Sequence, residues 1–405
     1  MGGHSAAESA ASVIDITAVQ AALSTEGVDA WLLYDFRGQN PIAGDVTGVS
    51  RQEGHLATRR WYYLIPAKGE PRGLTHAIER DALAHLPGTT ERYAGRDQLE
   101  AGLKRLLSGL RRVAMEYSPE CAIPYVSRVD AGTVELVRRC GVDVVSSADL
   151  IQRFATTLTS DQIQMHRAAS EKVYRVKDRA FEAIARQVRD GVATNEYSIQ
   201  QQMAGWFREE GLVSDSDPNV SVGENAGNPH YLPTASSHRA IGRDELVLID
   251  LWGKLDRPGA VFADITWVGF TGKRPPKAYV DAFAAICEAR DAAIALAQSA
   301  LRSGRDVRGW EVDRAASAVL RNAGFGEHIL HRTGHSLGET VHGNGANMDD
   351  YETHDDRRLI EGSAFTIEPG LYFPDFGVRT EINMVVGHRD ATVTGPSQTE
   401  ILALV

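Results

Sequence analysis

The sequence has little cysteine, and this absence restricts the kind of protein it can be. Only three cysteines, Cys121, Cys140 and Cys287, occur among 405 residues, and no two of them form a CxxC pair. An odd number without that spacing argues against a disulfide framework and is typical of reducing compartments. We therefore expect a cytoplasmic protein in which all three thiols are small, buried, apolar side chains.

The sequence also lacks positive excess charge and long apolar runs. With 43 Lys+Arg against 54 Asp+Glu, the net charge is −11, which argues against nucleic acid as a partner. No run of 18 apolar residues occurs, and the first residues do not combine a basic with an apolar segment, so neither membrane insertion nor export is predicted. Residues 1–13 are rich in small side chains and are expected to form a flexible leader.

The length of the chain favours two domains, because a single hydrophobic core stops growing well below 405 residues. Thr159 and Gln162 have the spacing of a capping box at the start of a long helix, so a boundary is expected between residues 14–158 and residues 159–405. In the first of these domains, short apolar segments alternate with amphipathic helices such as 129–141, which predicts an α/β fold. The expected strands lie at 29–35, 59–66, 111–118 and 142–147.

Four glycines predict an internal repeat in the second domain. Gly191 and Gly211 are 20 residues apart, as are Gly304 and Gly324, and each pair follows the expected ends of two successive helices. An extended segment follows each second glycine. We infer two α-α-β halves with the active site between them, although helix-terminating glycines are common enough to give this spacing without a duplication.

Two aspartates are expected to meet on a hairpin. Asp250 and Asp264 lie in extended segments joined by a Pro-Gly reversal, and each is seven residues from Arg257. A turn centred on Arg257 would place them directly opposite each other, with Cβ atoms about 5 Å apart. A shared divalent cation would relieve the repulsion of two such carboxylates. The alternative is that Asp250 ends its strand and Asp264 is a turn or surface residue.

Three histidines, His331, His335 and His342, fall within twelve positions of a glycine-rich segment. Each alone could be a core or surface histidine, but 13 histidines spread over 405 residues would rarely cluster in this way. The neighbouring glycines allow close approach of the backbone to a ligand. The cluster therefore favours a binding or catalytic site.

Glu368 and Glu381 each interrupt or follow an apolar extended segment and are expected to be buried. A buried ion pair between Glu381 and Arg379, two residues earlier on the same strand face, is the competing explanation. Four carboxylates and one imidazole form an oxygen-rich donor set that suits two divalent ions better than a structural zinc site.

Several segments of the chain, which follow one another in the same order as in the family, resemble the creatinase/aminopeptidase "pita-bread" metallopeptidases, especially Xaa-Pro aminopeptidases and Xaa-Pro dipeptidases (prolidases). Residues 14–155 resemble the family's N-terminal domain more loosely. The resemblance implies an α/β N-terminal creatinase-like domain and an α+β pita-bread catalytic domain with a pseudo-twofold internal repeat. The segments are ENAGNPHYLP, LIDLWG with ADITW, HRTGHSLGETVH, IEPGLY and GVRTE.

The resemblance implies a metal ligand set that is complete in this chain. Asp250 would chelate one ion, His335 and Glu368 the other, and Asp264 and Glu381 would bridge them. Two divalent ions, with manganese preferred over cobalt, zinc or iron, would lower the pKa of a bridging water and give a hydroxide that attacks the scissile carbonyl.

Further roles follow from the same resemblance. Glu368 is expected to accept a proton, while His342 and His230 would stabilise the tetrahedral intermediate or help the leaving nitrogen. His331 and Arg379 would line the substrate pocket.

The chain departs from the family pattern in two places. The gap between Asp250 and Asp264 is a few residues longer, which lengthens the hairpin loop. Trp267 stands where an arginine usually follows the second aspartate, which is expected to change packing or charge beside the ligands and so affect substrate preference.

The function expected from the resemblance is hydrolysis of the bond between an N-terminal residue and proline in a small peptide, by a homodimer. The resemblance does not distinguish a dipeptidase, which cleaves dipeptides, from an aminopeptidase, which cleaves longer peptides. The family also contains creatinase, which hydrolyses its substrate without metal, a metal-dependent lyase and inactive binding modules. Retention of the five ligands disfavours the metal-free and inactive alternatives.

Overall fold

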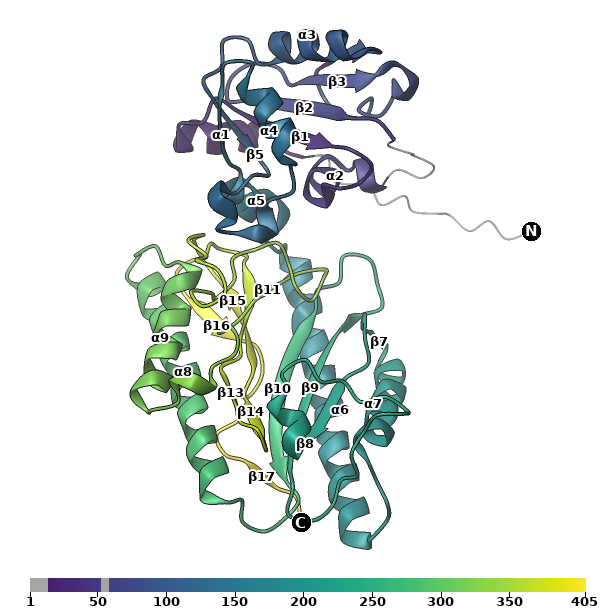
Figure 1. The fold of residues 1–405 in the computed structure, drawn as a ribbon, viewed down its shortest axis with the longest axis vertical. Helices are drawn as coiled ribbons and strands as arrows, with labels where there is room; N and C mark the ends of the chain where they lie inside the picture. Colours follow the sequence, from purple (N-terminus) through teal and green to yellow (C-terminus); the bar gives the residue numbers. More distant parts are fainter. Residues whose placement is uncertain (1–13, 52–57) are drawn as a thin grey trace, which may run out of the picture. The chain divides into compact units, whose positions relative to one another are not determined.

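The structure is a computed structural model that describes residues 14–51 and 58–405 (Figure 1). The chain divides into two compact units, Met1–Ala155 and Thr156–Val405. This division lies three residues before the boundary expected after residue 158. The expected leader, residues 1–13, lies outside the described residues.

The first unit is built on a six-stranded sheet with the strand order β4-β3-β2-β1-β5-β6. β2 is antiparallel to both neighbours, whereas the β1–β5, β5–β6 and β3–β4 pairs are parallel. Five strands therefore run in one direction and β2 in the other. The strands are β1 (Ala30–Asp35), β2 (Trp61–Pro66), β3 (Arg72–His76), β4 (Thr89–Tyr93), β5 (Arg112–Met115) and β6 (Asp143–Ser146).

Helices cover both faces of this sheet. Apolar side chains of α3 and α4 pack with one face, and those of α1, α2 and α5 pack with the other. Because both faces are covered, every residue of β1 and β2 is buried, as expected for near-continuous apolar strands. The elements are α1 (Ile16–Glu26), α2 (Pro41–Thr47), η1 (Val49–Arg51), η2 (Ala77–Glu79), α3 (Arg96–Leu106), η3 (Pro119–Cys121), η4 (Pro124–Val126), α4 (Ala131–Arg138) and α5 (Ala148–Ala155).

The four strands expected from apolar segments are present as β1, β2, β5 and β6, and the helix expected at 129–141 is α4. The sequence analysis missed β3 and β4. β4 has the sequence TTERY and is exposed at four of its five positions, because it is an edge strand. A polar edge strand lacks the apolar pattern by which strands are found in a sequence.

The second unit begins with the helix α6 (Ser160–Asp190), and its capping box is confirmed. The backbone N–H of Gln162 donates to Oγ1 of Thr159 at 3.2 Å, and the N–H of Thr159 donates to Oε1 of Gln162 at 3.0 Å. The other helical elements of this unit are α7 (Glu196–Glu210), η5 (Gly223–Gly227), α8 (Lys277–Arg302), α9 (Gly309–Asn322) and η6 (Gly326–His328).

The pseudo-twofold repeat is visible in the arrangement of these helices. α6 and α7 cover one side of the strands, and α8 and α9 cover the other (Figure 1). The four glycines each follow a helix end and have positive φ, from 67° at Gly211 to 87° at Gly324. A left-handed residue at this position stops the helix, and glycine adopts that conformation without steric cost.

The strands of the second unit form three sheets. β17-β10-β9-β7, with β8 paired to β9, carries the strands of the first half together with β17, which follows the second half in the sequence. The sheets β11-β12-β15-β16 and β13-β14 carry strands of the second half. The bounds are β7 (Leu212–Val213), β8 (Asn219–Val222), β9 (Leu246–Leu255), β10 (Ala263–Phe270), β11 (Ser336–Leu337), β12 (Ala364–Ile367), β13 (Gly370–Tyr372), β14 (Gly377–Arg379), β15 (Ile382–Val386), β16 (Ala391–Val393) and β17 (Leu402–Ala403).

The hairpin β9–β10 is confirmed, but its expected register is wrong by two residues. Asp264 pairs with Trp252, and Asp250 pairs with Thr266, so the two aspartates are diagonal neighbours. The reversal is centred on Pro258, with Gly259 at a φ of 74°, and three residues follow before β10 begins. Because side chains alternate with a period of two, a shift of two keeps both aspartates on one face.

The expectation that all three thiols are buried is wrong for two of them. All are free, but only Cys287 is buried, whereas Cys140 is partly exposed and Cys121 is exposed. Cys121 lies in η3, a short turn at the surface, where no apolar periodicity marks its position. None of the helices in residues 14–51 and 58–405 is both long enough and apolar enough to cross a membrane.

His166 joins α6 to the two segments that precede β10 and follow β16. It is fully buried, and its Nδ1 lies 2.7 Å from the carbonyl oxygen of Phe262 while its Nε2 lies 2.8 Å from Oγ1 of Thr394. A carbonyl only accepts, so Nδ1 carries the proton and Nε2 accepts from the hydroxyl. Burial lowers the pKa of His166 from 6.5 to about 4.

We expect His166→Ala to lower the free energy of unfolding by about 1–3 kcal/mol at pH 7, because it leaves a buried carbonyl without a donor. The neutral ring's contribution is fully present above pH 6.5 and is lost as the pH falls toward 4, since the unfolded chain takes up the proton first. Urea unfolding at pH 7, 6 and 5 should show the difference between wild type and variant shrinking with acidification.

The exposed His388 provides a matched control, because its side chain is 83% exposed and pairs only with Glu361 among the described residues. We expect His388→Ala to change the free energy of unfolding by less than about 0.5 kcal/mol. A difference for His166→Ala that stays constant or grows between pH 7 and pH 5 would contradict a neutral, buried ring.

Candidate metal centre

Four of the five expected ligand residues lie at or near strand ends, and the five come from both halves of the second unit. Asp250 is in the middle of β9, and Asp264 is the second residue of β10. His335 directly precedes β11, Glu368 directly follows β12, and Glu381 directly precedes β15. The β12–β15 ladder ends with the pair Ile367 and Ile382, so Glu368 and Glu381 stand opposite each other one step beyond it.

Hydrogen bonds between the halves hold two of these strands together. The backbone N–H of Asp264 donates to Oδ1 of Asn383 at 2.9 Å, and the amide nitrogen of Asn383 donates back to the carbonyl oxygen of Asp264. The N–H of Glu381 donates to the carbonyl oxygen of Thr266 at 3.2 Å. The hydroxyl of Thr266 also donates to Oε2 of Glu381 at 2.8 Å. The two bridging candidates are thus fixed relative to each other.

The segment that carries His335 lies unusually close to β12. The N–H of His335 donates to Oγ1 of Thr366 at 3.0 Å, and the N–H of Thr366 donates to the carbonyl oxygen of His335 at 2.8 Å. A Cβ added at Gly334 would lie 2.0 Å from the carbonyl oxygen of Thr366, so this position requires glycine. The glycine-rich segment was expected to bring its backbone close to a ligand, but at Gly334 it comes close to the backbone of β12.

The imidazole of His335 presents an unprotonated nitrogen to two carboxylates. Its Nδ1 donates to the carbonyl oxygen of Ser336 at 3.1 Å, which fixes the tautomer. Burial lowers the pKa of His335, so Nε2 carries a lone pair. This Nε2 lies 3.6 Å from Oδ2 of Asp264 and 3.5 Å from Oε1 of Glu368. Three acceptor atoms therefore face one another without a donor between them.

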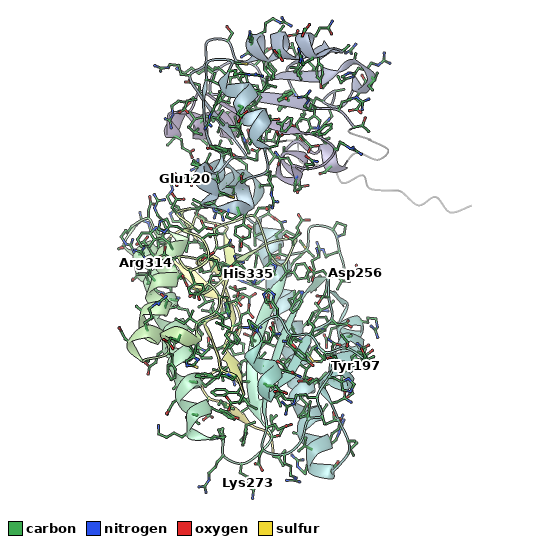
Figure 2. All side chains as sticks on the ribbon, viewed as in Figure 1. Glu120, Tyr197, Asp256, Lys273, Arg314 and His335 are labelled. Carbon is green, nitrogen blue, oxygen red and sulfur yellow. The ribbon has the colours of Figure 1, made fainter. Side chains whose placement is uncertain are left out.

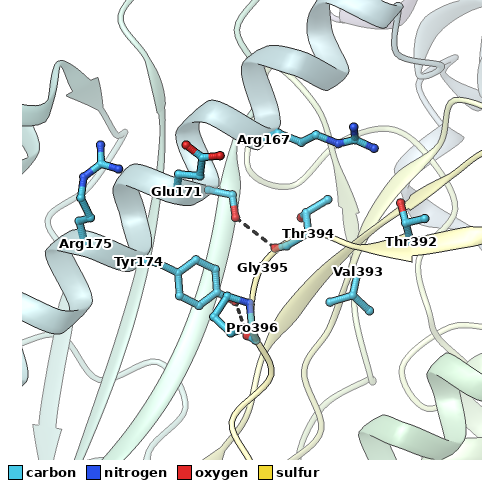
Figure 3. Close-up of a pocket in the computed structure, with 10 residues that line it drawn as sticks. Arg167, Glu171, Tyr174, Arg175, Thr392, Val393, Thr394, Gly395 and Pro396 are labelled. Atoms are coloured by element: carbon cyan, nitrogen blue, oxygen red, sulfur yellow. Dashed lines mark hydrogen bonds between the residues drawn. The ribbon is translucent and has the colours of Figure 1, made fainter.

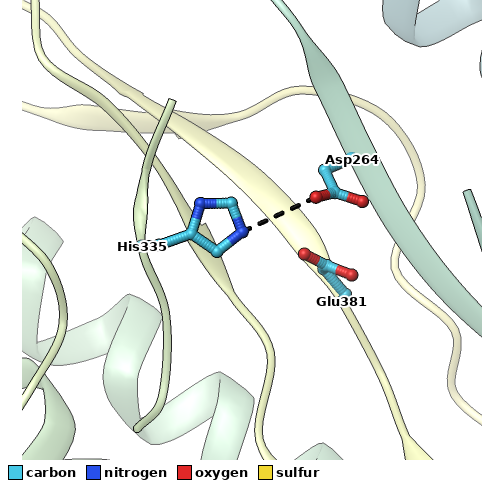
Figure 4. Close-up of side chains that lie close together, drawn as sticks. All are labelled: Asp264, His335 and Glu381. Atoms are coloured by element: carbon cyan, nitrogen blue, oxygen red, sulfur yellow. Dashed lines mark ion pairs between the residues drawn. The ribbon is translucent and has the colours of Figure 1, made fainter. Parts of the chain in front are cut away.

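Asp264, His335 and Glu381 form a compact set of ligand atoms (Figure 4). Each residue offers one atom that could bind a metal, these atoms lie within 4.8 Å of one another, and all three residues are buried. Figure 2 shows His335 in the interior of the second unit, whereas Arg314 and Lys273 lie at its surface. The side chains thus converge in a place that solvent reaches poorly.

The carboxylates of this set are electrostatically unfavourable without a cation. Burial, together with repulsion from neighbouring carboxylates, raises the pKa of Asp264 and of Glu381. Oδ1 of Asp264 and Oε1 of Glu381 are buried and have no hydrogen-bond partner among the described residues. Buried polar atoms without partners are costly, and divalent cations use carboxylate oxygen and neutral imidazole as ligands. These residues therefore fit a divalent metal.

Asp250 lies beside this set rather than within it. The guanidinium of Arg379 donates through Nη2 to Oδ2 of Asp250 and through Nε to Oγ1 of Thr266 at 3.0 Å. Arg379 thus pairs with Asp250, so the competing explanation of an ion pair with Glu381 does not describe its contact. Burial raises the pKa of Asp250 to about 7, with repulsion from Asp264 adding to it and Arg379 opposing it.

Glu368 is the fourth carboxylate near His335, and it is less buried than expected, with 14% of its side chain exposed. Its backbone N–H donates to the carbonyl oxygen of Thr333 at 2.6 Å, and its Oε1 accepts from Oγ1 of Thr366 at 3.1 Å. Its Oε2 lies 4.0 Å from Nε of Arg379. Glu368 is therefore held in place while part of its side chain stays accessible to solvent.

A chain of hydrogen bonds connects two of the expected substrate-binding residues. Nη1 of Arg379 donates to Oη of Tyr372 at 3.0 Å, and this oxygen lies 2.7 Å from Nε2 of His331. Nδ1 of His331 lies 2.6 Å from the carbonyl oxygen of Arg332, so Nε2 accepts from the tyrosine hydroxyl. Both His331 and Arg379 are thus held beside the carboxylates.

The structure places the two expected catalytic histidines differently. The ring of His342 packs edge-on against that of His335, with centroids 4.4 Å apart. Although the residue is exposed, desolvation of its ring and the adjacent His335 lower the pKa of His342. His230 is exposed in the segment after η5. Within residues 14–51 and 58–405, none of the ligand residues' hydrogen bonds or ion pairs involves His230.

Trp267 does not face the ligands. It is three residues after Asp264 on β10 and therefore points to the opposite face of the sheet. There its ring meets Tyr174 of α6 edge-on, with centroids 6.1 Å apart, and Nζ of Lys177 lies 3.8 Å from its centroid. The expectation that this substitution alters packing beside the ligands is wrong, because the strand alternation turns the side chain toward α6.

A cavity of about 610 Å³ lies between α6 and residues 392–396 (Figure 3). The hydroxyl of Ser170 donates to the carbonyl oxygen of Thr394 at 3.1 Å, and that of Tyr174 donates to the carbonyl oxygen of Pro396 at 2.7 Å. These bonds join α6 to the end of the chain. None of the expected site residues lines this cavity.

Sequence reasoning missed the residues that fix the ligands in place. Thr266, Thr366, Tyr372 and Asn383 make the hydrogen bonds that orient ligand side chains or join the halves. Thr266 lies two residues after Asp264 and shares its strand face, and Asn383 has the same relation to Glu381. A polar residue two positions from an expected ligand within an apolar strand was the signal that could have found both.

Comparisons with known proteins find relatives that are named dipeptidases. The Xaa-Pro dipeptidase of Lactobacillus helveticus is 31% identical over 238 residues, which cover 58% of each chain. A probable dipeptidase PepE of Mycobacterium tuberculosis is 29% identical over 256 residues, 63% of this chain and 62% of its own length. The chain thus spans about three-fifths of the length of these curated relatives.

Solved structures show the same fold over nearly the whole chain. Dipeptidase PepE from Mycobacterium ulcerans has a TM-score of 0.69 and 22% identity, with 96% of both chains covered. The prolidase from Pyrococcus horikoshii has a TM-score of 0.61 and 19% identity, with 96% of this chain and 99% of the prolidase covered. The fold is therefore an α/β creatinase-like domain followed by an α+β pita-bread domain with a pseudo-twofold repeat.

The family comparison covers the segments that carry the ligand residues. A model described as metallopeptidase family M24 matches residues 168–388, which is more than half of the chain and includes all five expected ligands. The chain therefore belongs to metallopeptidase family M24.

Proposed function

We propose that this protein hydrolyses the bond between an N-terminal residue and proline in small peptides, with two divalent ions held by its second unit. The observation that carries the proposal is the unprotonated Nε2 of His335, which faces carboxylate oxygens of Asp264 and Glu368 at 3.6 and 3.5 Å. Only a cation or a proton makes such a group of acceptors favourable.

The proposed metal ligands are the five residues of the expected set. Manganese is the proposed ion, because four carboxylates and a single imidazole form a mainly hard, oxygen-rich donor set. When bound, such ions lower the pKa of a shared water and polarise a carbonyl oxygen. The ligands are Asp250, Asp264, His335, Glu368 and Glu381.

The remaining residues are assigned roles from their positions. Glu368 is partly exposed and anchored through Thr366, so it is the proposed acceptor of the proton from the attacking water. His342, packed against His335, is proposed to donate a hydrogen bond to the developing oxyanion or to help the leaving nitrogen. His230 is proposed to assist from its exposed segment.

Arg379 is proposed to act as a positioning residue as well as a wall of the substrate pocket. All three of its guanidinium nitrogens donate to protein groups, namely Asp250, Thr266 and Tyr372. It thereby fixes the orientation of one ligand, and through Tyr372 it orients His331. Outer partners of metal ligands of this kind commonly change metal affinity or activity by 10- to 100-fold.

Selectivity for proline rests on the named relatives. The Lactobacillus helveticus relative is named an Xaa-Pro dipeptidase, and the Pyrococcus horikoshii structure is a prolidase. An Xaa-Pro bond is a tertiary amide without an N–H, so peptidases that depend on that donor handle it poorly. A cytoplasmic location is proposed because all three cysteines are free, and the expected homodimer stays a prediction.

Purified protein is expected to contain close to two divalent ions per chain, and Glu381→Ala is expected to lose at least one. Removal of a bridging carboxylate leaves two like-charged ions poorly screened at short range. Activity should fall by more than about 100-fold, since even outer partners of metal ligands cost 10- to 100-fold. Elemental analysis and peptide hydrolysis measure both quantities.

Glu361→Ala is the matched control, because this glutamate is 64% exposed and pairs with His388 away from the ligands. It should keep the metal content and the activity of the wild type. Active wild-type protein that contains no metal would overturn the proposed mechanism.

His335→Ala and His342→Ala are expected to separate a metal ligand from a transition-state group. The first should lose metal, because Nε2 of His335 is the neutral donor among the carboxylates. The second should keep its metal and lower kcat by about 100-fold or more with a smaller effect on KM, as expected for an oxyanion contact. Equal metal loss in the two variants would show that this assignment of roles is wrong.

The substrate class is tested with Ala-Pro, Ala-Pro-Ala and Ala-Ala-Ala in the presence of manganese or cobalt. We expect the two proline peptides to be cleaved faster than Ala-Ala-Ala. Faster cleavage of Ala-Pro than of Ala-Pro-Ala indicates a dipeptidase, and the reverse order indicates an aminopeptidase. Equal cleavage of Ala-Ala-Ala, or no cleavage of any peptide by metal-loaded protein, would refute proline selectivity.

A further inference from the structure

The first unit contains a cavity of about 600 Å³ that is lined by residues of this unit alone. It lies where three strands that run in the same direction reach their carboxyl ends. Tyr34 is the penultimate residue of β1, and His76 and Tyr93 are the last residues of β3 and β4. In open, mainly parallel α/β sheets, ligands bind outside the carboxyl ends of strands, so the topology alone marks this edge as a binding position.

The charge of the cavity wall is opposite to that of the chain. Arg59, Arg60 and Arg96 line the cavity, and Asp130 is the acidic residue among the lining side chains. Asp130 is already engaged, because it accepts from the hydroxyl of Tyr34 at 3.2 Å and from the N–H and hydroxyl of Thr133 at 2.8 Å. In a chain with a net charge of −11, this excess of cations favours an anionic ligand.

Arg60 is the central cation of this wall. It is only partly exposed, and within residues 14–51 and 58–405 no carboxylate forms an ion pair with it. Its backbone carbonyl oxygen accepts from the hydroxyl of Tyr93 at 2.8 Å, which fixes Tyr93 and the backbone of Arg60 at the cavity. A guanidinium without a carboxylate partner is suited to bidentate recognition of a phosphate or a carboxylate.

The N-terminus of α3 adds further donors to the same place. Gly95 is the N-cap residue, so no side-chain oxygen accepts from the first turn, and the helical bonds begin with the N–H of Leu99. Gly95 has a φ of −97°, and a Cβ there would meet no atom within 4 Å, so neither backbone nor space requires glycine. The first N–H groups and the helix dipole are thereby left available to an anion.

The remaining walls are aromatic. Tyr34, Phe36 and Tyr93 line the cavity, and the ring of His76 meets Tyr93 edge-on with centroids 5.0 Å apart. The ring of His76 is held in this wall, since its Nδ1 accepts from the N–H of Ile78 at 3.3 Å and its Nε2 donates to the carbonyl oxygen of Ala94 at 3.1 Å. Aromatic walls beside a cationic end favour a ligand with a planar apolar group.

A buried hydroxyl beneath these walls has no partner. Tyr62 is fully buried, and its Oη makes no hydrogen bond within the part of the chain that the structure describes. Tyr62 pairs with Tyr34 across β1 and β2, and the two rings pack with centroids 5.0 Å apart, so Tyr62 lies behind a residue that lines the cavity. An unused buried donor is costly to a protein and points to a polar group or water bound beside it.

We propose that the first unit binds a small organic anion at this edge of its sheet. The ligand carries a phosphate or carboxylate, which Arg60, Arg96 and the first turn of α3 recognise. It also carries a planar group, which lies between the aromatic side chains of Tyr34 and Tyr93. This site is built from residues of the first unit alone, and its occupant differs from the peptide substrate proposed for the second unit.

Calorimetric titration of the full-length, metal-loaded protein tests the proposal with phenyl phosphate, benzoate and phenol as probes. We expect saturable binding of at least one of the two anions, and binding of phenol at least tenfold weaker. Phenyl phosphate and benzoate distinguish a phosphate site from a carboxylate site. Arg60→Gln and Arg96→Gln should each weaken binding of that anion at least tenfold.

Arg111→Gln is the matched control, because Arg111 is exposed and directly precedes β5, at the opposite edge of the sheet. It should bind the anion as the wild type does. The side chain of Arg96 is 82% exposed, so its substitution keeps the test valid even if Arg60→Gln fails to fold. Absence of anion binding, equal binding of phenol, or binding that is unchanged in Arg96→Gln would each overturn the proposal.

Discussion

The second unit depends on one electrostatic constraint, which is the burial of several carboxylates against a neutral imidazole. Asp264, Glu368 and Glu381 meet Nε2 of His335 without an intervening donor, and two of their oxygens have no partner among the described residues. Removing carboxylates from water is costly unless a cation compensates. Arg379 supplies one positive charge, but it is directed at Asp250. Divalent ions are the species that balance the remaining charge.

The scaffold turns this unfavourable cluster into a defined geometry by joining two similar halves. The β9–β10 hairpin belongs to the first half, and the β12–β15 pair belongs to the second. Asn383 bonds both backbone groups of Asp264, and Thr266 bonds both the backbone and the carboxylate of Glu381. Each half therefore fixes a ligand residue of the other. The duplication explains why the site lies where strands of the two halves meet.

The features that could be predicted from the sequence are those that depend on the pattern of neighbouring residues. The four glycines mark helix ends because a left-handed residue is needed there, and the pair Thr159 and Gln162 forms the capping box that was expected. The expected acidic ligands stand out because carboxylates in or beside apolar strands are costly, whereas the full set of five ligands is implied by the resemblance. These features need only a few neighbouring residues to be recognised.

The features that could not be predicted from the sequence depend on which distant segments pair with each other. The register of Asp250 and Asp264 was wrong by two residues, because the reversal is centred on Pro258 and its length cannot be read from the turn residues alone. The partners Thr266 and Asn383 are polar residues of ordinary appearance until β10 and β15 are side by side. Trp267 was misplaced although strand alternation alone puts it on the opposite face of β10, three residues after Asp264, and only its contact with Lys177 depends on the packing of α6.

The most direct test of the central claim is an anomalous difference map from crystals of the manganese-loaded protein. We expect two peaks per chain among the five ligand side chains, one of them beside Nε2 of His335. Peaks elsewhere in the chain, or a metal-free cluster in which protons alone separate these side chains, would contradict this claim.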